Sequence, residues 1–173
     1  YQLHCHIISI KKDSDTMVRE LFQRINTYGV KMSYQEIRCA LYPGSSVKFL
    51  RYIAESKPFQ LATFGKIQPK RMKDMELVLG AVSHILFGYK NFSETKFDSF
   101  LTKAMQALNK RKQITAHWAD PSTLLLNPNP EIDNYPTYEE EKSDPLFNEI
   151  LSRFNSALNL ASDIFGQSRF KKE

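Results

Sequence analysis

The stretch from Asp74 to Gly88 constrains the fold of this chain more than any other part of the sequence. Its apolar residues fall on nearly every face of a helix instead of forming one stripe. A helix of that kind is stable in water only when other elements surround it. We therefore expect a helix at the centre of a bundle, ended by Gly88. The apolar residues are Met75, Leu77, Val78, Leu79, Ala81, Val82, Ile85, Leu86 and Phe87.

This apolar stretch is too short to cross a membrane, which takes roughly 20 apolar residues in succession. No basic start leads into the apolar core of a signal peptide either, so we expect a cytoplasmic protein without a membrane partner. The cysteines Cys5 and Cys39 lack the close spacing of a zinc ribbon or a disulfide scaffold, and buried thiols are expected. Because Tyr1 opens a strand-like stretch, we expect a piece of a longer protein.

The organisation of the chain fits one domain, or the greater part of one. The chain has 173 residues, 42% of them hydrophobic and 25% charged, as is usual for globular proteins. Apolar periodicity predicts a mainly α fold, a bundle of about six helices with one N-terminal strand. The expected parts are a strand at 1–10, a helix, turn, helix unit at 15–42, a helical bundle at 46–112, a mobile loop at 113–143 and a C-terminal helix at 145–165.

Short-range signals place the first helix ends. Ser33 and Glu36 have the spacing of a capping box, which predicts a helix that begins at Tyr34. Pro58 is expected to end the next helix, because proline interrupts the hydrogen bonds of a helix interior. The chain over 59–69 is then expected to be irregular.

Similar signals place the later helices. Ser93 is the expected cap of an amphipathic helix that ends in the basic run Lys110–Lys112. Asp144 as cap, with Pro145 in the first turn, opens the last helix. Gly166 is expected to end that helix.

The segment 22–41 is the part of the sequence richest in groups that carry chemistry. Within its predicted helix, turn, helix unit, Arg24 and Asn26 flank the apolar Ile25 near the turn. An arginine can hold a phosphate through paired hydrogen bonds, and an asparagine amide can orient a base, a ribose or a water molecule. The pattern is therefore compatible with a nucleotide site.

The same segment also has an ordinary structural interpretation. Arg24 suits a surface cation at a helix C-terminus, and Asn26 suits a helix terminator. Glu36 completes the capping box without any ligand, and Arg38 is then a solvated side chain. Spacing alone leaves both interpretations open.

Beyond these signals, the run from Phe22 to Leu41 resembles a family signature. The signature reads Phe-x-Arg-hydrophobic-Asn-x-x-Gly-x-x-Leu/Ser-x-x-Glu-hydrophobic-Arg-x-Ala, with Met32-Ser33 together at its Leu/Ser element. It belongs to the N-terminal nucleotidase domain of GmrSD-type modification-dependent restriction enzymes and related phage-defence proteins. The stretch Arg71–Leu79 is similar to the next helix of that family. The stretch Ile164–Phe170 resembles its closing pattern of phenylalanine, glycine and phenylalanine.

The resemblance implies a fold and a function. That domain is related to the α+β nucleotidase fold of ParB and sulfiredoxin, and this chain matches its helical half. The implied activity is nucleotide binding and hydrolysis, coupled to attack on modified foreign DNA as in type IV restriction. By resemblance, the nucleotide-binding residues are Arg24, Asn26, Glu36 and Arg38, with a nucleoside triphosphate and a divalent cation as cofactors. The implied partners are the nucleotide, modified DNA and a nuclease domain or subunit.

The chain also departs from the family pattern. The Asp-Gly-Gln-Gln-Arg motif thought to carry the nucleotide chemistry is absent, and so is the histidine and asparagine metal motif of the nuclease half. Gly80 stands where the family often has arginine. We therefore assign no catalytic residue, and we expect hydrolysis by the intact parent protein and none by this fragment alone.

The basic residues support a second, non-enzymatic hypothesis. A net charge of +5 and a pI near 9.1 suit phosphate or nucleic-acid partners. The module would then sense DNA or dock a partner through its basic faces, although an ordinary solvated surface is the simpler interpretation of these residues. The candidate nucleic-acid-binding residues are Lys70, Arg71, Lys110, Arg111 and Lys112.

The histidines and glycines suggest no further site. His4 and His6 share one side of the predicted strand, but no third metal ligand is identifiable, and no metal site is assigned. His84 is expected to be a core histidine, and His117 to lie in the long loop. The 6 glycines include no Walker-type or dinucleotide-binding loop.

Overall fold

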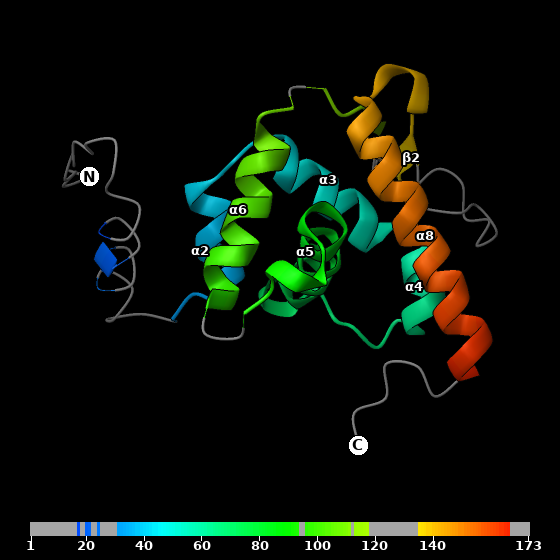
Figure 1. Cartoon of the computed structure of the whole chain (residues 1–173), viewed down its shortest axis with the longest axis horizontal. Coiled ribbons are helices and arrows are strands. Elements are labelled where there is room, and N and C mark those ends of the chain that lie inside the picture. The colour runs from blue at the N-terminus through cyan, green and yellow to red at the C-terminus, as the bar shows by residue number, and fades with distance from the viewer. Residues whose placement is uncertain are drawn as a thin grey trace, which may run out of the picture.

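The computed structural model describes residues 31–93, 96–111, 113–117 and 135–166, together with residues 17, 20, 21 and 24. Six α-helices and one short two-stranded sheet make up the regular structure of these residues, which confirms the predicted mainly α fold (Figure 1). The α-helices are α2 (Tyr34–Leu41), α3 (Ser45–Glu55), α4 (Lys57–Thr63), α5 (Lys73–Phe87), α6 (Phe97–Asn109) and α8 (Pro145–Phe165). Three short 3₁₀ helices are η2 (Lys70–Met72), η3 (Tyr89–Asn91) and η5 (Glu140–Lys142).

Helix α5 lies at the centre of the bundle, as its apolar sequence predicts (Figure 1). It packs against α3, α6 and α8, with Val78, Leu79 and Val82 fully buried. The prediction is incomplete in one respect, because Leu77 is exposed and Ile85 only half-buried. Thus α5 keeps one face open to solvent.

The described residues contain no helix that is both long enough and apolar enough to span a bilayer. Cys39 is buried as expected, and burial raises the pKa of its thiol, whereas the hydrogen bond from Gln35 and the charge of Arg38 lower it. A thiol of this kind stays protonated and unreactive. Cys5 lies outside the described residues.

Several predicted helix ends are confirmed. Ser33 and Glu36 form both hydrogen bonds of the capping box at the start of α2. The Asp144 side chain accepts a hydrogen bond from the Leu146 N–H at 2.9 Å and caps α8, and Gly166 ends that helix. These ends were predictable because each depends on neighbours in the sequence.

The structure corrects the prediction that the chain is irregular over 59–69. Residues 57–63 form α4, with Pro58 in its first turn and Phe59 and Ala62 buried against the core. Proline is tolerated there because the first N–H groups of a helix have no partner within it. Pro58 therefore starts a helix as well as ending one.

The predicted cap of α6 is also wrong. Helix α6 begins at Phe97 with Lys96 at the N-cap, three positions after Ser93. The Lys96 N–H donates to the Ser93 carbonyl at 3.0 Å immediately before the α-helix.

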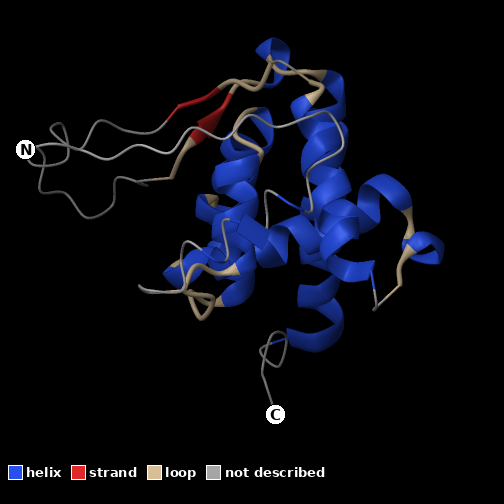
Figure 2. Cartoon of the chain, turned by 90° about the vertical axis from the view of Figure 1, so that its left-hand side faces the viewer, coloured by secondary structure: helices blue, strands red, loops and turns tan. Residues whose placement is uncertain are grey.

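The predicted loop at 113–143 contains regular structure that the sequence did not reveal. Strands β1 (Ala116–His117) and β2 (Thr137–Tyr138) pair antiparallel, and Figure 2 shows them at the edge of the helices. Two-residue strands are too short to show an alternating pattern. Residues 118–134 of this loop lie outside the description, as do the predicted strand at 1–10, His4, His6 and most of the helix predicted after residue 15.

Helix α6 closes the connection between α2 and α3 through one side chain. The Asn109 Oδ1 accepts the Ser46 N–H at 2.8 Å and so caps α3, while its Nδ2 donates to the Tyr42 carbonyl at 3.0 Å. Gly44 lies beneath this amide with a φ of 143°, and a Cβ added there would lie 2.8 Å from the Asn109 Oδ1. The connection therefore requires glycine at position 44 both for its backbone angle and for the lack of space for a Cβ.

Candidate functional site

The polar residues of the signature segment gather at the start of α2. The Ser33 Oγ accepts the Glu36 N–H at 3.1 Å and donates to the Arg71 carbonyl at 2.9 Å. The Arg71 Nε donates to the Glu36 Oε2 at 3.1 Å. The capping box thus binds η2 as well as its own helix. We call the whole set the α2 cluster, which comprises Ser33, Gln35, Glu36, Arg38, Arg71, Glu76 and Asp98.

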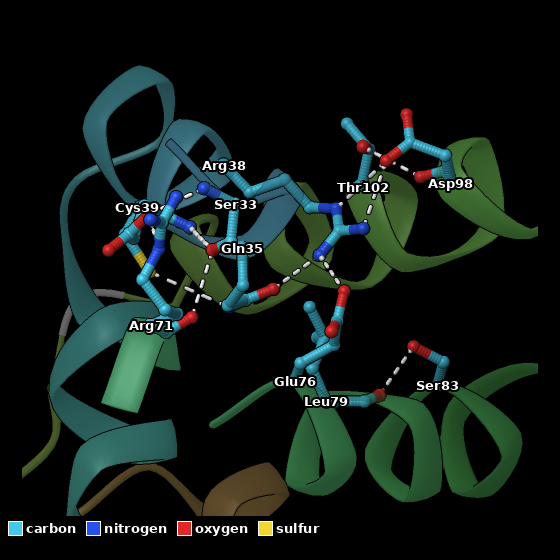
Figure 3. Close-up of polar contacts among 11 residues, drawn as sticks. Ser33, Gln35, Arg38, Cys39, Arg71, Glu76, Leu79, Ser83, Asp98 and Thr102 are labelled. Atoms are coloured by element: carbon cyan, nitrogen blue, oxygen red, sulfur yellow. Dashed lines mark hydrogen bonds and ion pairs between the residues drawn. The ribbon is translucent and has the colours of Figure 1, made fainter. Parts of the chain in front are cut away.

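Arg38 is the centre of the α2 cluster, as Figure 3 shows. Its side chain is only 3% exposed, so the expectation of a solvated arginine is wrong. Its Nε and Nη2 donate to the Asp98 Oδ1 at 3.1 and 2.9 Å, and its Nη1 lies 3.5 Å from the Glu76 Oε1. The Nη1 also donates to the buried Gln35 Oε1. A buried cation requires such pairing, because burial removes its hydration.

The turn that receives these contacts is strained. Arg71 and Met72 both have left-handed backbone angles, with φ of 64° and 55°. For a residue with a Cβ, this conformation costs roughly 1–2 kcal/mol. The hydrogen bond from Ser33 and the ion pair with Glu36 hold the turn in place. The α2 cluster therefore sets where α5 begins.

The structure separates the four predicted nucleotide-binding residues into two groups. Glu36 and Arg38 lie in the α2 cluster, where their charges pair with protein groups. Arg24 lies in a helical turn and is exposed, and Asn26 lies outside the described residues. Sequence reasoning missed both Gln35 and Asp98 as partners of Arg38. The i, i+3 spacing on α2 could have pointed to Gln35, whereas Asp98 lies 60 residues later and has no local signal.

The predicted nucleic-acid-binding residues that the structure describes lie near the two ends of α2. Arg71 contacts the first turn of α2, and Lys70 precedes it. Lys110 and Arg111 follow Asn109, which contacts the chain after α2. Helix α2, whose eight residues span about 12 Å, lies between the two groups. Arg111 also lies 3.8 Å from Asp144, and Lys112 lies outside the described residues.

A groove of about 360 Å³ opens between α4, α5 and α8. We call it the α5–α8 groove; its lining is apolar except for one imidazole. Beyond it, the exposed side chains Leu160, Ile164 and Phe165 continue along α8, which extends past α4 (Figure 1). The lining residues are Phe59, Leu77, Ala81, His84, Ile85, Phe154, Ala157, Leu158 and Ala161.

The two described histidines lie in other surroundings than predicted. His84 is exposed on the open face of α5, where its ring centroid lies 5.2 Å from those of Phe92 and Phe100. His117 belongs to β1 and contacts the Glu139 carboxylate. The hydrogen bond from Lys142 lowers the pKa of Glu139, and the one from His117 adds to this effect.

Metal ligands are not gathered in the described part of the chain. No group of three or more His, Cys, Asp or Glu side chains there lies close enough together to hold a metal ion. The divalent cation implied by the family resemblance stays a prediction.

The fold and the α2 cluster define a mainly helical chain with an internally paired polar centre. Comparison with family models, with curated proteins and with solved structures finds no match in any of the three.

Proposed function

We propose that this chain is the helical part of a nucleotide-binding domain in a bacterial phage-defence protein that acts on modified foreign DNA. One observation supports the proposal: the two sequence segments that carry the family resemblance contact each other. Glu36 pairs with Arg71, 35 residues later, and Arg38 pairs with Glu76, 38 residues later. Two segments can form one site only if they lie next to each other in the folded chain, and these contacts meet that condition.

Within this proposal the signature residues have different roles. Glu36 and Arg38 are positioning residues, because a phosphate would have to displace carboxylates that already neutralise the buried guanidinium. Arg24 is exposed and so can reach a phosphate. Asn26 has no described position and keeps its predicted role of orienting the base, the ribose or a water molecule.

The proposal is tested by nucleoside-triphosphate hydrolysis in the intact parent protein. Arg24→Ala and Asn26→Ala are each expected to lower kcat/KM at least about tenfold, because each removes a direct contact with the nucleotide. Arg51→Ala is the matched control, since Arg51 is an exposed arginine on α3. Circular dichroism confirms that all variants are folded. Unchanged turnover in both variants would reject the proposed nucleotide site at Arg24 and Asn26. Asn26 would then have only the role of a helix terminator.

The α5–α8 groove favours a second candidate function, the docking of a partner helix. The small side chains Ala81, Ala157 and Ala161 line the groove and leave room for another helix to approach closely. Its apolar lining disfavours a charged occupant. The exposed side chains of Leu160 and Ile164 continue the apolar surface along α8 beyond the groove. The fitting partner is an amphipathic helix that inserts its apolar face, as in other helix-in-groove complexes.

Docking is tested with the nuclease part of the parent system as the partner. Ala161→Arg is expected to weaken its binding at least about tenfold, because a charge would be buried in an apolar groove. Ser156→Arg adds the same charge at an exposed position of α8 that does not line the groove and serves as the control. Isothermal titration calorimetry measures both. Equal affinities of Ala161→Arg and the wild type would exclude the groove as the docking site.

A further inference from the structure

An exposed group of aromatic rings lies where α5 connects to α6. Tyr89 is 76% exposed, Phe97 40% and Phe92 36%, which is unusual for side chains of this size. The Phe92 ring centroid lies 5.9 Å from that of Phe97 and 5.2 Å from that of His84. The ring of Phe100 lies 5.8 Å from Phe92 and forms a buried floor. We call Phe92, Phe97 and His84, together with the exposed Tyr89 at the start of the same connection, the aromatic patch.

The backbone around the aromatic patch is well supported. Gly88 ends α5 with a φ of 74°, and the chain turns at once into η3. The Asn91 Nδ2 donates to the Phe87 carbonyl at 2.6 Å, and the Phe92 N–H donates to the Tyr89 carbonyl at 3.1 Å. Rings that are held in place before binding lose little conformational entropy when a ligand stacks on them.

Three lysines are neighbours of the aromatic patch along the chain. Lys90 lies within η3, Lys96 precedes the first residue of α6, and Lys103 follows two turns later on the same side of α6. All three are exposed, and none forms an ion pair with another described residue. The neighbouring carboxylate of Asp98 is engaged by Arg38. The patch therefore combines exposed ring surface with three exposed ammonium groups.

We propose that the aromatic patch and these lysines bind single-stranded nucleic acid. Bases stack on the exposed rings, and the ammonium groups contact the phosphates, which is how sequence-tolerant single-strand sites are built. A duplex hides its base faces and does not fit exposed rings. A protein partner would bury the rings without needing the lysines. The proposal is independent of the nucleotide site, because neither Arg24 nor Asn26 takes part.

The test is fluorescence anisotropy with a labelled oligothymidylate of about 12 nucleotides, within the range that small single-strand sites cover. Tyr89→Ala and the double variant Tyr89→Ala/Phe97→Ala are expected to weaken binding at least about fivefold, because stacking on a lost ring disappears. The ring-preserving variant Tyr89→Phe keeps the affinity. Tyr34→Ala also keeps it, since Tyr34 is a 62% exposed tyrosine on α2. Tyr89 has no ring partner among the described residues, so its removal leaves the fold intact.

Salt dependence tests the lysines separately. Replacing Lys90, Lys96 and Lys103 by glutamine is expected to reduce the slope of log K against log salt by about 2, because each phosphate contact on a single strand contributes about 0.7. Three results would overturn the proposal: unchanged affinity in both Tyr89→Ala and the double variant, equal affinity for a duplex of the same length, or competition by ATP as effective as by the oligonucleotide. A failure of the hydrolysis test leaves these measurements unaffected.

Discussion

Arg38→Ala is expected to lower the free energy of unfolding by about 3 kcal/mol, near the lower end of the range for breaking a buried ion pair. The substitution removes the guanidinium that Gln35, Glu76 and Asp98 share. Both carboxylates are partly exposed, so water can hydrate them after the loss and limit the cost. Gln35 is fully buried and loses its strongest partner. Urea denaturation measures the change as a lower midpoint at constant m value.

The control for Arg38→Ala is Arg51→Ala on α3. Arg51 pairs with Glu55 at 2.8 Å, but its side chain is exposed, so its removal is expected to cost less than about 0.5 kcal/mol. A double-mutant cycle of Arg38→Ala with Asp98→Ala then isolates the coupling between the two partners. Equal losses for Arg38→Ala and Arg51→Ala would mean that the α2 cluster adds nothing to stability.

Gly44→Ala is expected to destabilise the chain by about 2–3 kcal/mol, through two separate costs. Its φ of 143° lies in a region that L residues rarely adopt, and the new Cβ would meet the Asn109 Oδ1 at 2.8 Å. Moving the Asn109 amide away removes the cap from Ser46 and the hydrogen bond to Tyr42. Thermal unfolding followed by circular dichroism shows the change as a lower Tm.

Two further variants separate the costs at Gly44. Gly65→Ala has a positive φ of 62° but no atom within 4 Å of the new Cβ, so it is expected to cost only about 1 kcal/mol. Combining Gly44→Ala with Asn109→Ala relieves the clash, and the double variant should cost less than the sum of the two single variants. Strict additivity, or equal effects at Gly44 and Gly65, would show that Asn109 does not restrict this connection.

The sequence predicted those parts of the fold that depend on neighbouring residues. Ser33 with Glu36 and Asp144 with Pro145 start helices where expected, because a cap bonds to a backbone group two or three positions away. Helix α4 was missed because a proline marks the start of a helix as readily as its end.

The candidate site shows the same division between local and distant partners. The signature marked Glu36 and Arg38 as important, and both belong to the α2 cluster. Their use there depends on Arg71 and Asp98, which come from distant parts of the chain and carry no local signal. His84 was misplaced for a related reason, since periodicity could not show that one face of α5 stays open.

The two left-handed residues before α5 have a consequence for how the molecule opens. Arg71 and Met72 would relax to ordinary backbone angles as soon as the contacts from Ser33 and Glu36 were lost. Detaching the start of α2 therefore releases the backbone strain at Arg71 and Met72. When these two residues return to their left-handed angles, the Arg71 carbonyl is again placed to accept the hydrogen bond from Ser33. We therefore expect the two segments, which are far apart in sequence, to open and close as one cooperative unit.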